Sequence, residues 1–206
     1  MTVSALILSM LDGTISDRFT VIQRFIGDRS VMDLGCVDSR RERSDTAARV
    51  QHKVNMLHKR IASANVDTLG VDIDPEGVAA LNAQGYHTIV AGEIIEHLAN
   101  PGQFLCNLAR HLSDDGVLII STPNPFYAGF TWKIWRYGKP SAHEEHMGWQ
   151  DPITLGQLLR HCGFEVIEAH WVQPRSTLLK ELKSWKRFLR PYFCECFLMV
   201  ARKLPA

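Results

Sequence analysis

The sequence lacks the cysteine patterns of disulfide-rich and zinc-binding proteins. Five cysteines occur in 206 residues, an odd number, and no Cys-x-x-Cys motif is present. Disulfide frameworks pair an even number of cysteines, and structural zinc sites usually carry cysteine pairs at Cys-x₂₋₄-Cys spacing. We therefore expect reduced thiols and a cytoplasmic protein.

The sequence also lacks long hydrophobic runs and an excess of one charge. Its first eleven residues are apolar, but they carry no basic leader and are too short to span a bilayer, so we expect them to pack against the domain. Lys and Arg number 23 against 22 for Asp and Glu. This balance argues neither for nor against nucleic-acid binding. The length fits a single domain over residues 1–206.

A dinucleotide-binding glycine pattern is absent after the first expected strand. Positions 35, 37 and 40 read Gly, Val and Arg instead of Gly-x-Gly-x-x-Gly. This departure argues against a nicotinamide-dependent dehydrogenase.

Short apolar runs alternate with helical patterns along the chain. Expected strands cover residues 30–36, 68–74, 88–92, 117–121, 164–169 and 197–201. Expected helices cover residues 46–64, 75–83, 103–112 and 154–162. The alternation predicts an α/β fold with a doubly wound, mainly parallel sheet, whose ligands bind at the carboxyl ends of the strands.

Two of these strand ends carry residues suited to a nucleoside ligand. Gly35 follows the first strand, and a glycine there lets the backbone approach a ligand closely. Asp72 ends the second strand, where a carboxylate can accept both ribose hydroxyls. By itself this pattern also fits a plain strand-to-helix turn.

Four strings extend the pattern into a family resemblance. They are Val31-Met-Asp-Leu-Gly-Cys36, Gly70-Val-Asp-Ile-Asp74, Val90-Ala-Gly-Glu-Ile-Ile-Glu-His-Leu98 and Ser121-Thr-Pro-Asn-Pro125, in that order. Together they resemble class I S-adenosylmethionine (SAM)-dependent methyltransferases with a Rossmann-like fold, especially ubiquinone-pathway O-methyltransferases and methyltransferases of glycan clusters. The resemblance covers roughly residues 20–172 and implies that SAM is the cofactor. It assigns SAM contacts to Asp33, Gly35, Cys36, Val37, Asp72, Ile73, Gly92 and Glu93, with Asp72 on the ribose and Gly92 and Glu93 beside the sulfonium.

The chain departs from this family in two places. Val37 stands where members usually have glycine, which adds bulk near the cofactor. Tyr86 is followed almost at once by the strand at 88–92, which leaves little chain for the family's usual third strand and its adenine-contacting acid. We therefore expect an edge strand that is short or missing.

The cluster Glu93-Ile-Ile-Glu96-His97 is the most informative group of polar residues. If a helix begins here, the spacing i, i+3 and i+4 places both carboxylates and the imidazole on one face. Such a face suits a divalent cation, or a general base at His97 oriented by Glu96. A structural hydrogen-bonded pair of Glu96 and His97 is the third interpretation.

The resemblance favours a metal at this cluster. Small-RNA 3′-end 2′-O-methyltransferases and ubiquinone-pathway members with the same five-residue pattern are metal-dependent. Applied to this chain, the resemblance implies that Glu93, Glu96 and His97, with His146 or His143, bind Mg²⁺ or another divalent cation. The metal would orient two substrate oxygens and acidify the hydroxyl to be methylated.

Two further segments carry interleaved aromatic and basic residues. Residues 123–139 are expected to form a substrate lid, or else a helix that packs Phe130, Ile134 and Trp135 inward. Residues 176–190 predict a basic amphipathic helix, which suits either a cover for the core or peripheral contact with an anionic membrane.

These features predict methyl transfer from SAM to a hydroxyl, or an amine, of a sugar, a glycan precursor or a small quinone-like molecule. The first alternative is an RNA 2′-O-methyltransferase, which needs a basic groove that the near-zero net charge does not favour. The second is a binding module without activity. The sequence leaves the oligomeric state open.

Overall fold

The computed structural model describes residues 2–11, 16–35, 56–65, 67–71, 85–139, 144–172 and 193–204. The helices are α1 (Val3–Leu11), α2 (Arg18–Ile26), α3 (Met56–Ala64), α5 (Pro101–His111), α6 (Ala128–Tyr137) and α7 (Pro152–His161), with a one-turn 3₁₀ helix, η2 (Ile95–His97). The strands are β1 (Val31–Leu34), β2 (Thr68–Val71), β3 (Tyr86–Gly92), β4 (Leu112–Pro123), β5 (Phe164–Val172) and β6 (Cys196–Lys203).

The six strands form one mixed, mainly parallel sheet in the order β2-β1-β3-β4-β6-β5. Strands β1 to β4 are parallel, and β6 runs antiparallel to both of its neighbours. This confirms the predicted α/β architecture. On one side the sheet ends at β2, and within the described part of the chain no strand lies beyond it. Residues 72–84, where the departure from the family was noted, lie outside the described residues.

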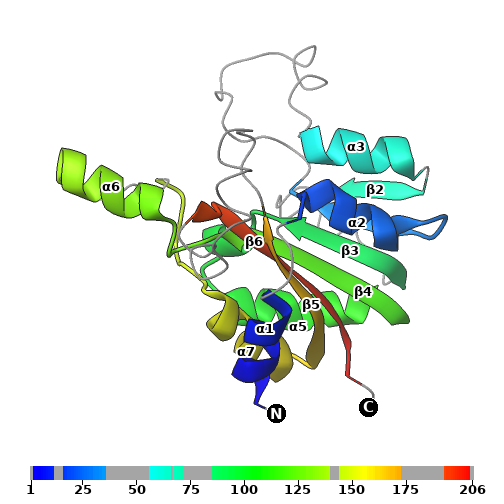
Figure 1. The fold of residues 1–206 in the computed structure, drawn as a ribbon. Helices are drawn as coiled ribbons and strands as arrows, with labels where there is room; N and C mark the ends of the chain where they lie inside the picture. Colours follow the sequence, from blue (N-terminus) through cyan, green and yellow to red (C-terminus); the bar gives the residue numbers. More distant parts are fainter. Residues whose placement is uncertain are drawn as a thin grey trace.

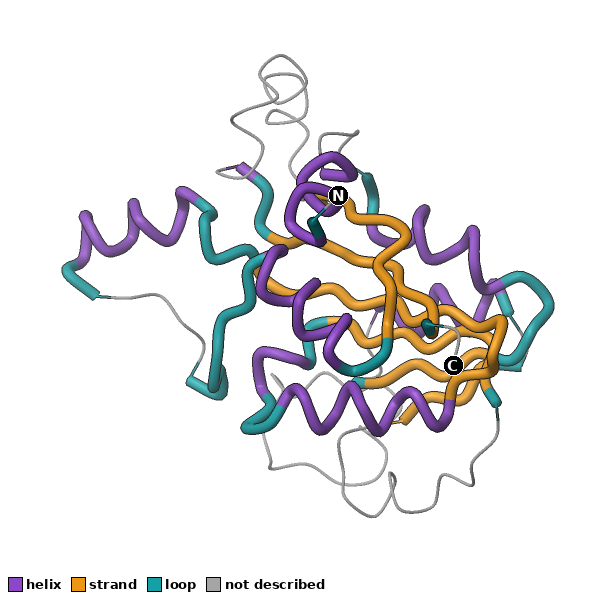
Figure 2. The backbone as a smooth tube through the Cα atoms, turned by 90° about the horizontal axis from the view of Figure 1, so that it is seen from below, coloured by secondary structure: helices purple, strands orange, loops and turns teal. Residues whose placement is uncertain are grey.

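Helices cover both faces of the sheet (Figures 1 and 2). Helices α1, α5 and α7 lie on one face, and α2 and α3 lie on the other. Neighbouring strand residues divide between the two layers, as alternating side chains must. Ile89 and Ala91 belong to the core under α5 and α7, whereas Val90 packs with Ile22 and Ile61 on the other face.

Local capping explains where α5 and α7 begin. Asn100 accepts a hydrogen bond from the backbone N–H of Gln103, and Pro101 occupies the first helical position. Asp151 forms a reciprocal capping box with Thr154. Both helices were predicted from their apolar spacing, and these caps start each of them two residues earlier than expected.

The apolar N-terminal segment packs as expected. Helix α1 buries Ile7 and Leu11 against α7 and β5. Gly156 of α7 allows this close approach, because a Cβ at that position would overlap the Ile7 side chain. Within the described ranges, no helix is long and apolar enough to cross a membrane.

Helix α6 projects away from the sheet and its covering helices (Figure 1). It buries none of its residues, and Trp135 is 79% exposed. The inward packing considered for Ile134 and Trp135 is therefore wrong. Gly138 ends the helix in the left-handed conformation, with φ at 66°.

Three of the predicted helices fall wholly or partly outside the described residues. The helix expected at 46–64 is described only from Met56 onward. The helix expected at 75–83 and the basic helix at 176–190 are not described.

Candidate functional site

The candidate site lies at the carboxyl edge of the parallel strands, where β1, β3 and β4 end side by side. Gly35 follows β1 with a left-handed φ of 71°, and its N–H donates to the carbonyl of Val71 at 2.8 Å. A Cβ at this position would lie 2.9 Å from Cδ1 of Ile94. Backbone conformation and close approach both require glycine here.

Asp33 lies at the base of this turn and is buried. Its Oδ2 is 2.9 Å from Nδ1 of His58 on α3. Burial raises the pKa of Asp33, and the hydrogen bond and charge of His58 oppose that rise. The pair therefore links β1 to α3 next to the predicted SAM loop.

Of the residues assigned to SAM, the structure describes Asp33, Gly35, Gly92 and Glu93. The first two flank the end of β1, and the last two flank the end of β3, which pairs with β1. Cys36, Val37, Asp72 and Ile73 lie outside the described residues, so their assignments stay predictions.

Glu93 has an unusual backbone conformation and a cationic partner. Among the described residues it is the only non-glycine with a clearly positive φ, at 59°, and its N–H donates to the carbonyl of Ser121 at 2.8 Å. Its Oε1 accepts a hydrogen bond from Nη2 of Arg18 at 2.6 Å. The expected helix beginning at Glu93 is therefore wrong. A left-handed residue breaks the i, i+3 relation to Glu96.

Glu96 lies in η2 and is only 1% exposed. Oγ1 of Thr122 donates to its Oε2 at 3.0 Å. Burial, with a further contribution from the charge of Glu93, raises the pKa of Glu96 to about 7. A buried carboxyl group that titrates near neutrality is typical of a functional site.

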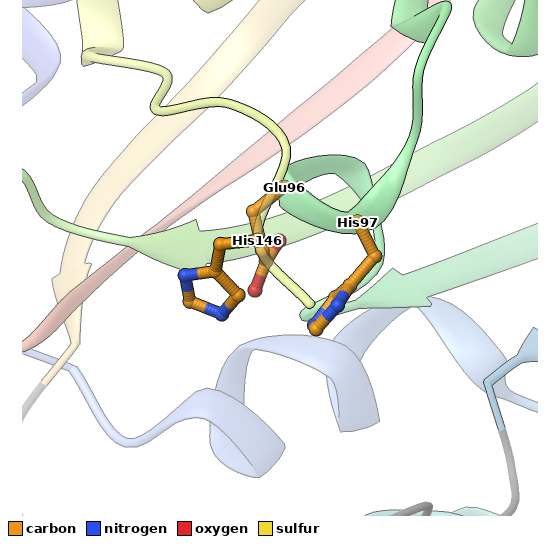
Figure 3. A group of neighbouring side chains, drawn as sticks. All are labelled: Glu96, His97 and His146. Carbon is orange, nitrogen blue, oxygen red and sulfur yellow. The ribbon is translucent and has the colours of Figure 1, made fainter. Parts of the chain in front are cut away.

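His97 and His146 flank this carboxylate (Figure 3). The backbone carbonyl of Glu96 accepts from the N–H groups of Met147 and Gly148, at 2.8 and 3.2 Å, which fixes the distant segment against η2. The two imidazole rings meet edge to face, with centroids 4.8 Å apart. One potential ligand atom from each of Glu96, His97 and His146 lies within 4.8 Å of the others.

An aromatic chain leads from this cluster toward α6. The rings of His146 and Trp149 lie 5.6 Å apart, and those of Trp149 and Phe130 lie 5.1 Å apart. Phe130 also contacts Tyr127 at the start of α6. The projecting helix therefore joins the body of the domain beside the candidate site.

Among the described residues, one predicted metal ligand does not join the others. The structure brings together Glu96, His97 and His146, but it directs Glu93 to Arg18. His143 lies outside the described residues. The role of Glu93 as a ligand stays a prediction that this geometry does not favour.

Sequence reasoning missed Arg18 and Thr122. Arg18 is 75 residues from Glu93 along the chain and lies in no motif, so no local signal marked it. Thr122 belongs to the string Ser121–Pro125 at the end of β4, where residues 116–122 are all buried. Alternation along the strand therefore does not single it out, and its bond to Glu96 could not be predicted from the sequence.

Comparisons with known proteins agree with this arrangement. A family model described as "Methyltransferase domain" matches residues 23–169. The ubiquinone biosynthesis O-methyltransferase of Rickettsia prowazekii is 44% identical over 43 residues, which are 21% of this chain and 17% of that protein. The enzyme of the same name from Rickettsia akari is 29% identical over 96 residues, covering 46% of this chain and 32% of that protein. The chain thus matches only a minor part of these relatives.

Solved structures show the same fold at low identity. A SAM-dependent methyltransferase from Archaeoglobus fulgidus superposes with a TM-score of 0.59 at 14% identity, covering 98% of this chain and 95% of its own. Magnesium protoporphyrin IX methyltransferase from Synechocystis PCC 6803, with bound SAH, gives 0.53 at 12% identity, covering 98% and 81%.

Proposed function

The chain belongs to the methyltransferase-domain family and is a SAM-dependent methyltransferase, and from this premise we propose that it methylates a hydroxyl, or an amine, of a sugar, a glycan precursor or a quinone-like ring. The cluster of Glu96, His97 and His146 carries the proposal. It combines a buried carboxyl group with two imidazoles at the edge of the sheet where the family binds its substrates.

These three residues fit a divalent cation. One carboxylate and two imidazoles form a donor set that suits first-row transition metals such as Mn²⁺, and a more oxygen-rich set with water would suit Mg²⁺. The pKa of Glu96 near 7 fits this role, because a cation would displace the proton that burial favours. When bound, the cation would polarise the acceptor hydroxyl and lower its pKa.

The surrounding residues would keep this cluster in position. Thr122 orients the Glu96 carboxylate, and the hydrogen bonds from Met147 and Gly148 to the Glu96 carbonyl hold His146 near His97. Fixing donor and acceptor groups in line supplies much of the rate enhancement in group transfer.

A metal-free mechanism uses the same residues. His97 would accept the hydroxyl proton, and Glu96 would stabilise the imidazolium that forms. The two mechanisms differ in one measurable respect, because only the first requires a divalent cation for transfer.

The acceptor side of the site is proposed to include α6. Its side chains from Thr131 onward are exposed, and they include Trp132, Trp135 and Tyr137 interleaved with two cationic residues. Aromatic faces stack on sugar and quinone-like rings, and cations bind attached phosphates. Membrane contact by the basic helix at 176–190 also stays a proposal.

An RNA acceptor is the second candidate function. The exposed tryptophans and cations of α6 favour it, since aromatic residues can stack on unpaired bases. Methyl transfer to the 3′ end of a short RNA, tested beside catechols and sugar hydroxyls, would separate this candidate from the first.

The decisive experiment is calorimetric titration with SAM and S-adenosylhomocysteine, with and without Mn²⁺ or Mg²⁺. We expect cofactor binding in the wild type and its loss in Asp72→Ala. A heat that requires the metal and disappears in Glu96→Gln would support the metal site. Cofactor binding and transfer that are unchanged by chelation would overturn the metal while leaving the general-base mechanism.

Glu144→Gln is the matched control for Glu96→Gln. It removes an exposed carboxylate near the same histidine segment without altering the buried cluster. If both variants lose the metal-dependent heat equally, the heat does not come from Glu96, His97 and His146.

A further inference from the structure

Two thiols meet where α5 packs against the end of α7. The Sγ atoms of Cys106 and Cys162 are 2.8 Å apart. The Cys162 thiol also donates to the carbonyl of Gly102, at 3.2 Å. A disulfide bond is about 2.05 Å long, so these sulfurs need to approach by less than about 1 Å.

The two thiols differ in their access to solvent. Cys106 is exposed on α5, whereas Cys162 is buried at the C-terminal end of α7. Burial, and then the neighbouring Cys106 sulfur, raise the pKa of Cys162. An oxidant from solvent therefore meets Cys106 first, and Cys162 lies behind it within bonding reach.

We propose that Cys106 and Cys162 form an oxidation site that converts reversibly to a disulfide under a peroxide such as hydrogen peroxide. The Cys106 thiolate attacks one peroxide oxygen, which breaks the O–O bond, forms a sulfenic acid and releases hydroxide. The Cys162 sulfur then attacks the Cys106 sulfur and displaces the second hydroxide. Two thiol protons convert both hydroxides to water, and the peroxide receives two electrons.

This bond would connect α5 and α7, the two helices that follow the segments of the candidate site. Helix α5 begins shortly after η2, which carries Glu96 and His97, and α7 begins shortly after His146. The hydrogen bonds from Met147 and Gly148 to Glu96 already join the two segments at their site ends. A disulfide would join the helices that follow them. The two segments would then be connected by hydrogen bonds at the site and by a covalent bond between α5 and α7.

The test compares the reduced 206-residue chain with the same chain after stoichiometric hydrogen peroxide. We expect two of the five thiols to disappear, and non-reducing peptide mapping to link the peptides that carry Cys106 and Cys162. The Tm should rise by roughly 5 °C or more, because the cross-link closes a long loop. Dithiothreitol should reverse both changes.

Three variants make the assignment specific. Cys106→Ser and Cys162→Ala should each abolish the linked peptide and the rise in Tm, whereas Cys194→Ala should behave like the wild type. Because Cys106 is exposed, its variant is expected to fold even if the Cys162 variant does not. A disulfide that maps to another pair, or a Cys106 that proceeds to sulfinic acid without cross-linking, would overturn the proposal.

Hydrogen exchange tests the link to the site separately. Amides in residues 94–100 and 146–151 should exchange more slowly in the oxidised chain than in the reduced chain. If the mapped disulfide leaves exchange in both segments unchanged, the inferred coupling to the site is wrong. Neither readout requires a methyl acceptor or a bound metal.

Discussion

The η2 turn and helix α6 both depart from the usual pattern of apolar residues inside and charged residues outside. The η2 turn buries a polar group, whereas α6 exposes apolar ones. In η2 a carboxyl group, Glu96, is 1% exposed, whereas in α6 two tryptophans, Trp132 and Trp135, are 53% and 79% exposed. Burying a charged group works against folding, and exposed aromatic side chains contribute no burial energy to it. Neither arrangement is explained by the stability of the domain, so both point to ligands.

The two regions nevertheless differ in how tightly they are held. Thr122 and the backbone of Met147 and Gly148 fix η2 within the domain. Helix α6 contributes no buried residue, and it contacts the rest of the domain where Phe130 packs against Trp149. We infer that η2 fixes the chemistry, while α6 meets the acceptor. Changes in η2 should therefore affect the chemical step, and changes in α6 should affect acceptor binding.

The largest effect is expected for Glu96→Gln. The amide keeps an oxygen for the Thr122 hydroxyl, but it neither accepts a proton nor supplies a carboxylate to a cation. We expect kcat to fall by roughly 10²- to 10⁴-fold, with S-adenosylhomocysteine binding retained. The measurement is the rate of S-adenosylhomocysteine release, with Glu144→Gln as the control. A variant that retains most of its kcat would remove η2 from the chemistry.

The same substitution should change how stability depends on pH. The pKa of Glu96 is about 7 in the folded chain against an ordinary 4.5, so the folded state binds more protons between these values. The free energy of unfolding should therefore fall as pH rises through this range, by at most about 3 kcal/mol. Gln does not titrate, so this loss should be absent in Glu96→Gln.

Urea unfolding at pH 4.5 and pH 8 in the presence of a chelator measures this difference. The stability of Glu96→Gln relative to wild type should increase across the range. A constant difference between the two proteins would show that the pKa of Glu96 is not raised in the folded chain.

Replacing Trp132 and Trp135 together by Ala should affect a different quantity. Because both side chains are exposed, we expect little change in Tm or in cofactor binding. The KM for the acceptor should rise by roughly 10- to 50-fold, corresponding to two lost aromatic stacking contacts. Steady-state kinetics with the identified acceptor tests this, and an unchanged KM would contradict a role for α6 in binding.

Trp171→Ala is the matched control for that double variant. Trp171 lies in β5 and is 5% exposed, and it packs against Phe197. Its loss should lower the free energy of unfolding by about 3–5 kcal/mol. The same residue type thus serves the fold in β5 and is expected to serve binding in α6.

The smallest effects are expected at two glycines in the left-handed conformation, Gly35 beside η2 and Gly138 at the end of α6. Gly35→Ala should lower the free energy of unfolding of the whole domain by about 1–2 kcal/mol, because of its positive φ and its contact with Ile94. A Cβ at Gly138 would have no atom within 4 Å. Because its φ is positive, Gly138→Ala should lower the stability of α6 alone by about 1 kcal/mol.

Thermal unfolding and acceptor KM distinguish these two results. Gly35→Ala should lower the Tm, whereas Gly138→Ala should leave the Tm unchanged and raise the KM a few-fold. A fall in Tm with Gly138→Ala would mean that α6 is folded as part of the domain core.

The sequence was sufficient to predict the sheet because burial dominates there. Residues such as Ile119, Ile120 and Val200 form apolar runs that leave few alternatives to a buried strand. Helix starts were less accurate, because the caps at Asn100 and Asp151 begin α5 and α7 two residues before the expected positions. The family strings then predicted SAM as the methyl donor, which the family match supports.

The site was only partly accessible because its geometry depends on distant contacts. The spacing from Glu93 to His97 suggested one helical face, but Glu93 has a left-handed φ and its carboxylate binds Arg18, so it does not join the group of Glu96, His97 and His146. His146 was included through the family resemblance, and its approach to His97 depends on backbone bonds across 50 residues. No local pattern encodes such bonds.

The position of β6 has a consequence for how the protein is made. This strand enters between β4 and β5, and its central residues, from Phe197 to Ala201, are almost completely buried on both faces. During translation, β5 leaves the ribosome before the strand that will join it to β4. Until β6 emerges, both neighbours expose unpaired edges, which are the surfaces most prone to aggregate in a nascent chain. The sheet therefore closes only after β6 has emerged, and chaperones that protect β-edges would act before that point.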